Sequence, residues 1–181
     1  MRMNTSDEAL ALAAAGGDAE AFSTLLSRCY DQLFAFAFRI TGHRAEAEDL
    51  TQDICAALPV KLSGFRGEAK FTTWLYRVAV NAAHDRRRRA ATHAKAANGW
   101  GDWEIGRQAT MAQEAQAQDW LAAAMQSLPP DLRDTVALVL GEDLTQREAA
   151  EVLGLSEGTI AWRMSEVKKR LKSLHEQEEQ A

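Results

Sequence analysis

The chain has 181 residues, of which 46% are hydrophobic, and a formal net charge of −5, which fits one ordinary domain or two small ones and argues against a protein that is basic throughout. Its two cysteines, Cys29 and Cys55, form no CxxC pair, so the sequence shows no zinc framework or disulfide scaffold and indicates reduced thiols in a cytoplasmic protein. No segment is apolar over the length of a membrane span, and the apolar run near the N-terminus lacks the basic flank of a secretion signal.

Helical patterns fill the first half of the chain, as the alanine-rich composition with three prolines favours. Asp18 is placed to cap a long helix, and Gly42 to end it. A third helix is expected to stop at Pro59, because a proline disfavours the helical conformation in the residue before it. A loop then leads to a fourth helix. The four predicted helices span about residues 7–15, 19–41, 44–58 and 70–90.

The third predicted helix has an acidic surface, formed by Glu46, Glu48, Asp49 and Asp53 beside an apolar stripe that includes Leu50. Paired carboxylates at helical spacing can serve acid–base catalysis or hold a metal ion. The four histidines are scattered, however, and none lies at a ligand spacing beside these carboxylates. We therefore expect neither an enzyme nor a metal centre. The surface is predicted to be solvated or to contact another protein.

The fourth predicted helix combines an apolar stripe with a polar face. Phe71 and Trp74 belong to the stripe and are interpreted as core residues, with base stacking as the alternative. The run Arg86–Arg89 supplies four adjacent guanidinium groups, which favours phosphate contact over a merely solvated helix end. Together with the loop before it, the helix suits single-stranded or melted DNA, where bases stack on rings while arginines hold the backbone. The candidate DNA-binding residues are Phe65, Arg66, Lys70, Thr73, Arg77, Asn81, Arg86, Arg87, Arg88 and Arg89.

A linker and a second helical unit follow. Residues 91–113 mix Gly, Asn and Ala without a constant apolar period and are predicted to be a flexible linker. The second unit is expected over residues 114–174. One helix is expected to contain Met125. The Pro129–Pro130 turn is expected to start the next helix, and Gly141 to end it.

The last two helices have the pattern of a helix-turn-helix. Thr145 and Glu148 can form a capping box at the start of the first helix, and Gly154 can end it in a left-handed conformation. Ser156 is placed to cap the second helix, whose buried stripe begins at Ile160. A short helix braced by another, with exposed polar residues at its N-terminal end, fits a major groove; the alternative is an ordinary helical hairpin. Its candidate DNA-binding residues are Ser156, Thr159, Trp162, Arg163, Lys168 and Lys169.

Positive charge is concentrated in two segments of the chain. Residues 61–95 carry nine basic and two acidic side chains, whereas residues 96–155 carry three basic and ten acidic ones. Residues 1–60 carry four and nine, and residues 156–181 carry five of each. Phosphate binding needs local positive potential and not a basic protein, so the acidic total is compatible with DNA binding. The acidic segments can screen non-specific binding or face a basic protein partner.

Three stretches in series resemble the bacterial extracytoplasmic-function (ECF) sigma factors, which are small alternative sigma subunits of RNA polymerase. The stretches include AEDLTQDI, FRGEAKFTTWLYRVAVN and LTQREAAEVLGLSEGTIAWRMSEVKKRL, and the resemblance covers about residues 7–174. It implies an all-α protein of two small helical domains joined by a flexible linker. These would be a sigma region 2-like domain over 7–90, a linker over 91–113 and a sigma region 4-like helix-turn-helix domain over 114–174.

The resemblance also implies roles for these segments. The first domain would dock on core RNA polymerase through Asp49, Leu50, Gln52 and Asp53. Its fourth helix would recognise and melt the minus-ten promoter element, with Asn81 facing the promoter DNA. The second domain would bind the minus-thirty-five element through its last helix. An anti-sigma factor, which is common in the family, is an expected partner, and neither a cofactor nor membrane insertion is expected.

The recognition helix departs from the pattern that is usual in the family. Ala161 and Glu166 stand where basic residues are common, and Trp162 stands where a serine is common. Trp162 is expected either to pack against a sugar or a thymine methyl group, or to cover a neighbouring helix.

We therefore predict an alternative sigma factor that binds core RNA polymerase and directs promoter-specific initiation. One alternative is a decoy of the same shape that binds an anti-sigma factor, but a decoy need not retain Arg77, Asn81 or a basic recognition helix. A plain helix-turn-helix regulator is another, but it would need neither the acidic helix nor the loop at residues 63–70.

Overall fold

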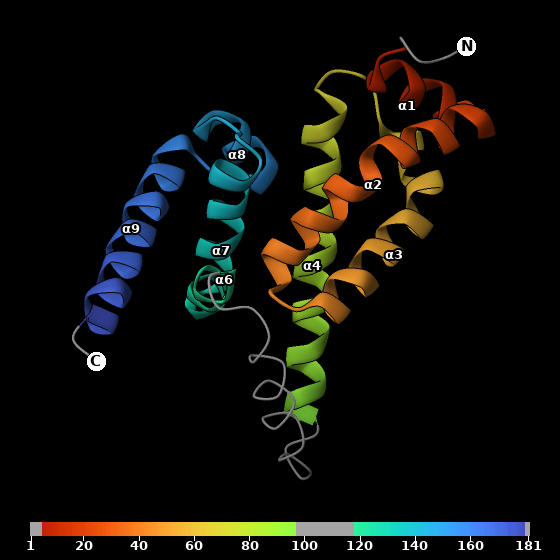
Figure 1. Cartoon of the computed structure of the whole chain (residues 1–181). Coiled ribbons are helices and arrows are strands. Elements are labelled where there is room, and N and C mark those ends of the chain that lie inside the picture. The colour runs from red at the N-terminus through yellow and green to blue at the C-terminus, as the bar shows by residue number, and fades with distance from the viewer. Residues whose placement is uncertain (1–4, 97–117, 180–181) are drawn as a thin grey trace.

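The computed structural model describes residues 5–96 and 118–179, and the regular structure in these two ranges is helical, which confirms the all-α prediction (Figure 1). Within them, no helix has the length and apolar character that a membrane crossing requires. The N-terminal unit contains α1 (Asp7–Ala15), α2 (Ala19–Thr41), α3 (Arg44–Lys61), the short 3-10 helix η1 (Leu62–Gly64) and α4 (Phe71–Ala96). The C-terminal unit contains α6 (Gln118–Ser127), α7 (Pro130–Val136), the π-helical turn η2 (Ala137–Gly141), α8 (Gln146–Leu153) and α9 (Glu157–Glu179).

Neighbouring residues cap both ends of α2, which begins and ends where the sequence predicts. The Asp18 carboxylate accepts a hydrogen bond from the Ala21 amide at 2.9 Å. At the other end Gly42 has a φ of 76°, a left-handed conformation that a residue without Cβ adopts at low cost. α3 then returns along α2, and their apolar faces pack together with that of α1.

α3 does not stop at Pro59 but continues to Lys61, so that prediction was wrong. Leu58 and Leu62 lie four residues apart and are both buried, and the helical path between them keeps them on one face. A proline in the last turn removes one hydrogen bond near the helix end. The burial of the two leucines offsets that loss.

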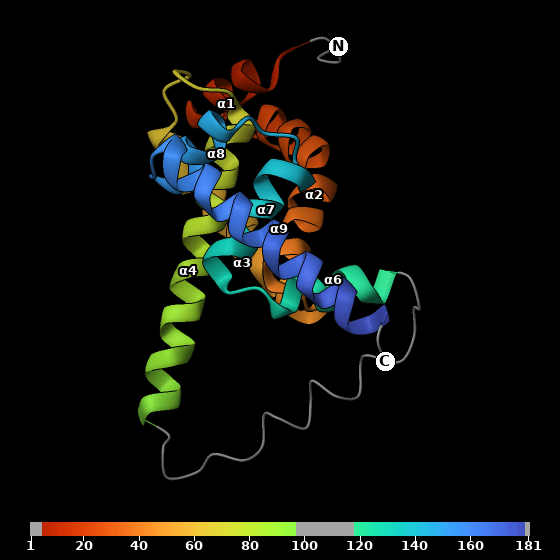
Figure 2. The same cartoon turned by 90° about the vertical axis from the view of Figure 1, so that its left-hand side faces the viewer.

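α4 is also longer than predicted, because it continues beyond Ala90 to Ala96. Residues 91–96 are therefore helix and not linker. Their sequence lacks glycine and proline and is rich in alanine, the residue of highest helix propensity. α4 crosses α2 and α3, and its C-terminal half projects beyond them (Figures 1 and 2). The rest of the predicted linker, residues 97–113, lies outside the described residues.

The predicted helix-turn-helix is present as α8 followed by α9. Thr145 and Glu148 form the capping box, in which each side chain accepts a hydrogen bond from the backbone amide of the other residue. Gly154 ends α8 with a φ of 66°. The Ser156 hydroxyl then accepts a hydrogen bond from the Thr159 amide at 3.2 Å, at the start of α9.

The two units pack against each other. α7 and η2 contact α2, while α8 contacts α4 (Figure 1). Buried side chains of both units belong to one hydrophobic cluster. The approach is close at the end of η2, where a Cβ added to Gly141 would lie 2.9 Å from the Cδ of Arg39. A glycine therefore fits here, because a residue with a Cβ would displace the Arg39 side chain.

Candidate nucleic-acid interface

Aromatic rings at the start of α4 form a packed cluster under the preceding loop. The Phe65 ring meets those of Phe71 and Trp74 edge to face, with centroids 5.9 and 5.5 Å apart. Phe65 is only 5% exposed, and Thr73 is also buried. Packing holds both side chains inside in this structure, and their predicted contact with DNA stays a prediction. Phe71 is a core residue, as interpreted, and Arg66 beside the cluster is exposed.

The polar face of α4 is divided between the C-terminal unit and solvent. The Lys70 ammonium group, just before the helix, lies 3.2 Å from the Glu148 carboxylate of α8. Arg77 donates a hydrogen bond to the backbone carbonyl of Glu151, also on α8. Asn81 is exposed and has no hydrogen-bond partner for its side chain among the described residues. Of the polar candidates in this part of α4, Asn81 is therefore open to solvent while Lys70 and Arg77 are engaged.

The arginine run at 86–89 is largely neutralised within the chain. Arg86 pairs with carboxylates of α3, and Arg87 pairs with a buried aspartate of α7. Arg88 pairs with Asp85 at 2.9 Å, one turn earlier on the same helix. Arg89 has no ion-pair partner among the described residues. In this arrangement Arg89 is the member of the run whose charge is available to a phosphate.

The predicted polymerase contacts lie on α3 and differ in accessibility. Asp49, Gln52 and Asp53 are exposed. The carboxylates of Asp49 and Asp53 lie 3.6 and 2.5 Å from the Arg86 guanidinium. Leu50, by contrast, is 0% exposed, because it is part of the apolar stripe that packs on α2 and α4. The Leu50 side chain is therefore a core residue in this structure, and its predicted contact with polymerase stays a prediction.

The exposed side of α9 carries one large apolar residue and several lysines. Trp162 is 60% exposed, so the alternative that it covers a neighbouring helix is not what the structure contains. Lys168 is exposed, and Lys169 pairs with Glu166 at 2.9 Å. At the start of the helix the hydroxyls of Ser156 and Thr159 lie 2.9 Å apart. These predicted DNA-binding residues therefore lie along the solvent side of α9.

Arg163 differs from the other predicted residues of α9. Its side chain is 17% exposed and contacts α7. The guanidinium donates hydrogen bonds to the Asp131 carbonyl at 3.2 Å and the Thr135 hydroxyl at 3.4 Å, and it lies 3.6 Å from the Asp131 carboxylate. These bonds occupy the guanidinium in this structure, and the predicted contact of Arg163 with promoter bases stays a prediction. Arg163 joins α9 to α7.

Glu142, just after η2, is the centre of the contact between the two units. Its side chain is 4% exposed and forms an ion pair with Arg39 of α2. It also accepts hydrogen bonds from the Tyr76 hydroxyl of α4 and, at 3.2 Å, from the Gln32 amide of α2. Burial and the hydrogen bond with Glu142 raise the pKa of Tyr76 above its ordinary value. One carboxylate thus links three side chains of the N-terminal unit to the C-terminal unit.

Asp134 of α7 forms a second ionic contact with the N-terminal unit. Its side chain is 1% exposed. It lies 2.9 Å from His84 Nε2 and 2.7 Å from Arg87 Nη2, and both residues belong to α4. A buried carboxylate is costly unless it is paired, so this contact favours the packed arrangement of the two units.

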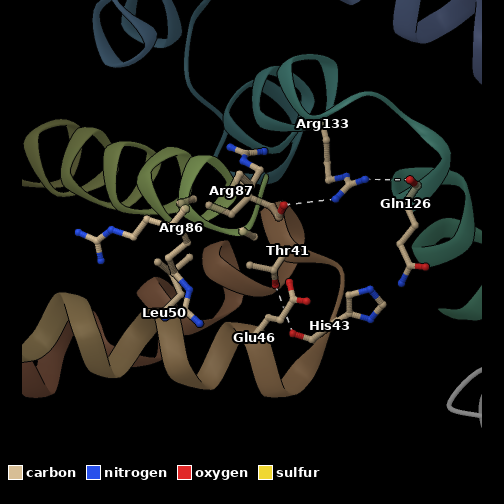
Figure 3. A pocket seen from close by; sticks show the side chains of 12 residues that line it. Thr41, His43, Glu46, Leu50, Arg86, Arg87, Gln126 and Arg133 are labelled. Atoms are coloured by element: carbon tan, nitrogen blue, oxygen red, sulfur yellow. Dashed lines mark hydrogen bonds between the residues drawn. The ribbon is translucent and has the colours of Figure 1, made fainter. Parts of the chain in front are cut away.

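A cleft of about 600 Å³ lies between the units (Figure 3). Its lining includes the arginines 86, 87, 89 and 133. Arg133 donates hydrogen bonds to the carbonyls of Met125, Gln126 and Leu128 at 2.8–3.1 Å, and burial lowers its pKa. Since, among the described residues, only Arg89 of the four lacks carboxylate or carbonyl partners, the cleft is a seam between the units and not a preformed anion site. No group of three or more His, Cys, Asp or Glu side chains in the described ranges could hold a metal ion.

Sequence reasoning missed the residues that join the two units, namely Arg39, Tyr76, His84, Asp134 and Glu142. The opposite charges of residues 61–95 and 96–155 were the available signal. That signal predicts attraction between the segments but does not identify the pairs, which depend on how the helices pack.

Comparison with known families defines the class of protein. Residues 25–92 match Sigma-70 region 2, and residues 118–171 match Sigma-70 region 4. The first range spans most of α2 through α4, and the second contains the helix-turn-helix. This combination defines a sigma subunit of RNA polymerase.

The chain also resembles individual sigma factors over nearly its whole length. It is 31% identical to the ECF RNA polymerase sigma factor SigM of Mycobacterium tuberculosis, over 96% of this chain and 86% of the relative. The structure of CnrH in complex with the cytosolic domain of CnrY matches with a TM-score of 0.67 and 28% identity, over 94% of this chain and 97% of the other. The sigma factor RpoE of Bartonella quintana, in complex with the anti-sigma factor NepR, has the same fold, with a TM-score of 0.71 at 21% identity over 87% and 98% of the two chains.

The chain belongs to the ECF RNA polymerase sigma factors. It is an alternative sigma factor, which binds core RNA polymerase and directs transcription initiation at promoters. Proteins of this class are regulators of transcription rather than enzymes.

Proposed function

We propose that the surfaces described above divide the work of this sigma factor between them. The exposed side of α3, with Asp49, Gln52 and Asp53, docks on core RNA polymerase. α4, with Asn81 and Arg89, engages the opened minus-ten element, and α9 binds the duplex of the minus-thirty-five element. The observation that supports this most strongly is the succession of a cationic helix and a helix-turn-helix within the two matched ranges.

Promoter binding then requires the two units to separate. Lys70 and Arg77 contact α8, and Arg87 contacts α7. While these groups are paired with the C-terminal unit, they are not free to neutralise DNA phosphates. The packed arrangement is accordingly a resting form of the chain, and the holoenzyme holds the units apart.

An anti-sigma factor is the partner that we propose for the packed arrangement. The solved structure of RpoE contains the anti-sigma factor NepR, and that of CnrH contains the cytosolic domain of CnrY. A partner that binds both units at once would stabilise their contact and keep Lys70, Arg77 and Arg87 paired with the C-terminal unit. Binding to such a partner and binding to a promoter are then mutually exclusive.

The chain itself performs no covalent chemistry and works in the cytoplasm, where core polymerase and DNA are located. Its contribution is differential binding, because it holds opened promoter strands more strongly than the closed duplex. Cationic groups hold the phosphates, and exposed polar groups such as Asn81 contact unpaired bases.

Run-off transcription with purified core polymerase and genomic promoter fragments tests this function. We expect transcripts from a small set of promoters only when the chain is present. The double variant Gln52→Ala/Asp53→Asn should reduce both core binding and transcript yield. The matched control Asp31→Asn, which removes one exposed charge from α2, should change neither. A wild-type chain that does not bind core polymerase would overturn the proposal.

A further inference from the structure

The N-terminal half of α9 has two chemically different sides. Ile160, Met164 and Val167 are buried against the rest of the C-terminal unit. The opposite side carries small exposed residues and charged ones such as Glu157 and Lys168, with Trp162 as the one large apolar side chain among its described residues. The small residues are Gly158, Ala161 and Ser165.

The exposure of Trp162 is not explained by the fold. A tryptophan buries 150–250 Å² when it is packed, and that burial stabilises a protein. Trp162 nevertheless remains 60% exposed, and its ring does not contact another aromatic ring in the described ranges. An indole exposed on a recognition helix is therefore available for contact with a ligand of that helix.

Other side chains near Trp162 are not suited to distinguish bases. Arg163, the next residue, is held by Asp131 and Thr135 of α7. Ser156 and Thr159 are engaged at the helix start, where they bond to each other and to the backbone. The lysines at 168 and 169 lie more than a turn further along and are suited to phosphates.

The major groove presents one apolar group to a protein, the C5-methyl of thymine. An indole ring can cover this methyl group by apolar contact, and the small residues Gly158 and Ala161 allow the helix backbone to approach the base edges closely. The lysines at the end of α9 would hold the adjacent phosphates and fix its register.

We propose that Trp162 is a specificity-determining residue that recognises a thymine methyl group in the upstream promoter element. This inference rests on the proposed role of α9 as the recognition helix. Arg163 acts as a positioning residue, because it fixes α9 against α7 and so places the indole.

Deoxyuridine, which differs from thymidine only by the missing methyl group, provides the test. Upstream elements bound by the holoenzyme are first selected from a randomised promoter library. Each thymine of the selected element is then replaced in turn by deoxyuridine, and the affinity of the holoenzyme is measured. We expect one or two positions at which the loss of the methyl group lowers affinity about fourfold, the factor that corresponds to the burial of one such group.

Variants of the chain show whether Trp162 causes this effect. In Trp162→Ala the affinity for thymine and deoxyuridine should become equal at those positions, while Trp162→Phe should retain part of the difference. The control Lys168→Ala should weaken binding evenly and leave the methyl effect unchanged. Thermal melting of the Trp162→Ala chain should match the wild type, since the side chain is largely exposed.

Three results would overturn the proposal. The first is a wild-type holoenzyme that shows no methyl effect at any position, and the second is a methyl effect that persists in Trp162→Ala. A Trp162→Ala chain that loses affinity equally for all sequences would place the indole on the backbone and would also overturn it. Run-off transcription by the same holoenzyme is measured in parallel, so a failure of the sigma activity itself is distinguished from a failure of this inference.

Discussion

Arg163 stabilises the recognition helix at the scale of a single side chain. Replacement by alanine removes its bonds to Asp131 and Thr135. Hydrogen bonds that involve a charged group contribute about 1.5–3 kcal/mol in favourable cases, and partial exposure reduces this, so we expect Arg163→Ala to lower the free energy of unfolding by about 1–2 kcal/mol. Urea denaturation measures this, with the exposed Arg170→Ala as the control. An unchanged midpoint would show that the contact to α7 contributes no stability.

Arg89 is the arginine of the run that we expect to contact a phosphate. Neutralising one phosphate contact reduces the slope of log affinity against log salt by about 1. Arg89→Ala should therefore weaken promoter binding by the holoenzyme and flatten its salt dependence by about that amount. The measurement is a titration of promoter fragments at several salt concentrations. A variant with the wild-type slope would contradict phosphate contact by Arg89.

At the scale of helices, α1 supports the start of α4. The Glu8 carboxylate of α1 accepts a hydrogen bond from the Phe71 amide at 3.0 Å. This bond is the largest cause of a pKa of Glu8 below its ordinary value. A carboxylate at the N-terminus of a helix also complements the helix dipole. Glu8 thus joins α1 to α4 through two residues that lie 63 positions apart in the chain.

Replacing Glu8 by glutamine should show this contribution through its pH dependence. A carboxylate near a helix N-terminus contributes about 0.3–1 kcal/mol, so Glu8→Gln should be less stable than the wild type by about that amount at pH 7. Because the folded pKa lies below the unfolded value of about 4.3, the contribution is present above that pH and disappears as the pH falls through the folded pKa. Urea denaturation at pH 7 and at stepwise lower pH measures the difference, with Asp31→Asn as the control. A difference that does not shrink in acid would contradict this cause.

Helix starts and helix stops could be predicted from the sequence where they depend on neighbouring residues. The caps at Asp18, Gly42, Thr145 and Gly154 involve groups a few residues apart, and each was found as predicted. The stop at Pro59 was wrong, because the packing of the neighbouring Leu58 and Leu62 into the core decides the path of the chain there. The same limit applies to site residues, since the periodicity of a helix does not show which side a second unit covers.

At the scale of the whole molecule, Glu142 holds the units together. Replacing this buried carboxylate by glutamine removes its ion pair with Arg39. Because Arg39 is partly exposed, we expect only a limited loss of stability. We expect Glu142→Gln to increase the affinity of the isolated chain for a single-stranded minus-ten oligonucleotide about tenfold, that is by about 1.4 kcal/mol. Fluorescence anisotropy with a labelled oligonucleotide measures this.

The neighbouring carboxylate provides a matched control for Glu142. Asp143 is exposed, and Asp143→Asn makes the same change in net charge without altering the contact between the units. If Asp143→Asn raised the affinity as much as Glu142→Gln, the effect would come from total charge and not from release of α4.

Acidic groups of one unit pair with basic groups of the other, so in the isolated chain the carboxylates take the place of dissolved counterions. Dissolved salt screens such pairs, which favours opening, but it also competes with DNA for the cationic groups that opening uncovers. For the chain without polymerase these two influences oppose each other. Its association with DNA should therefore pass through a maximum at an intermediate ionic strength, whereas a protein with permanently uncovered arginines would lose affinity steadily as salt is added.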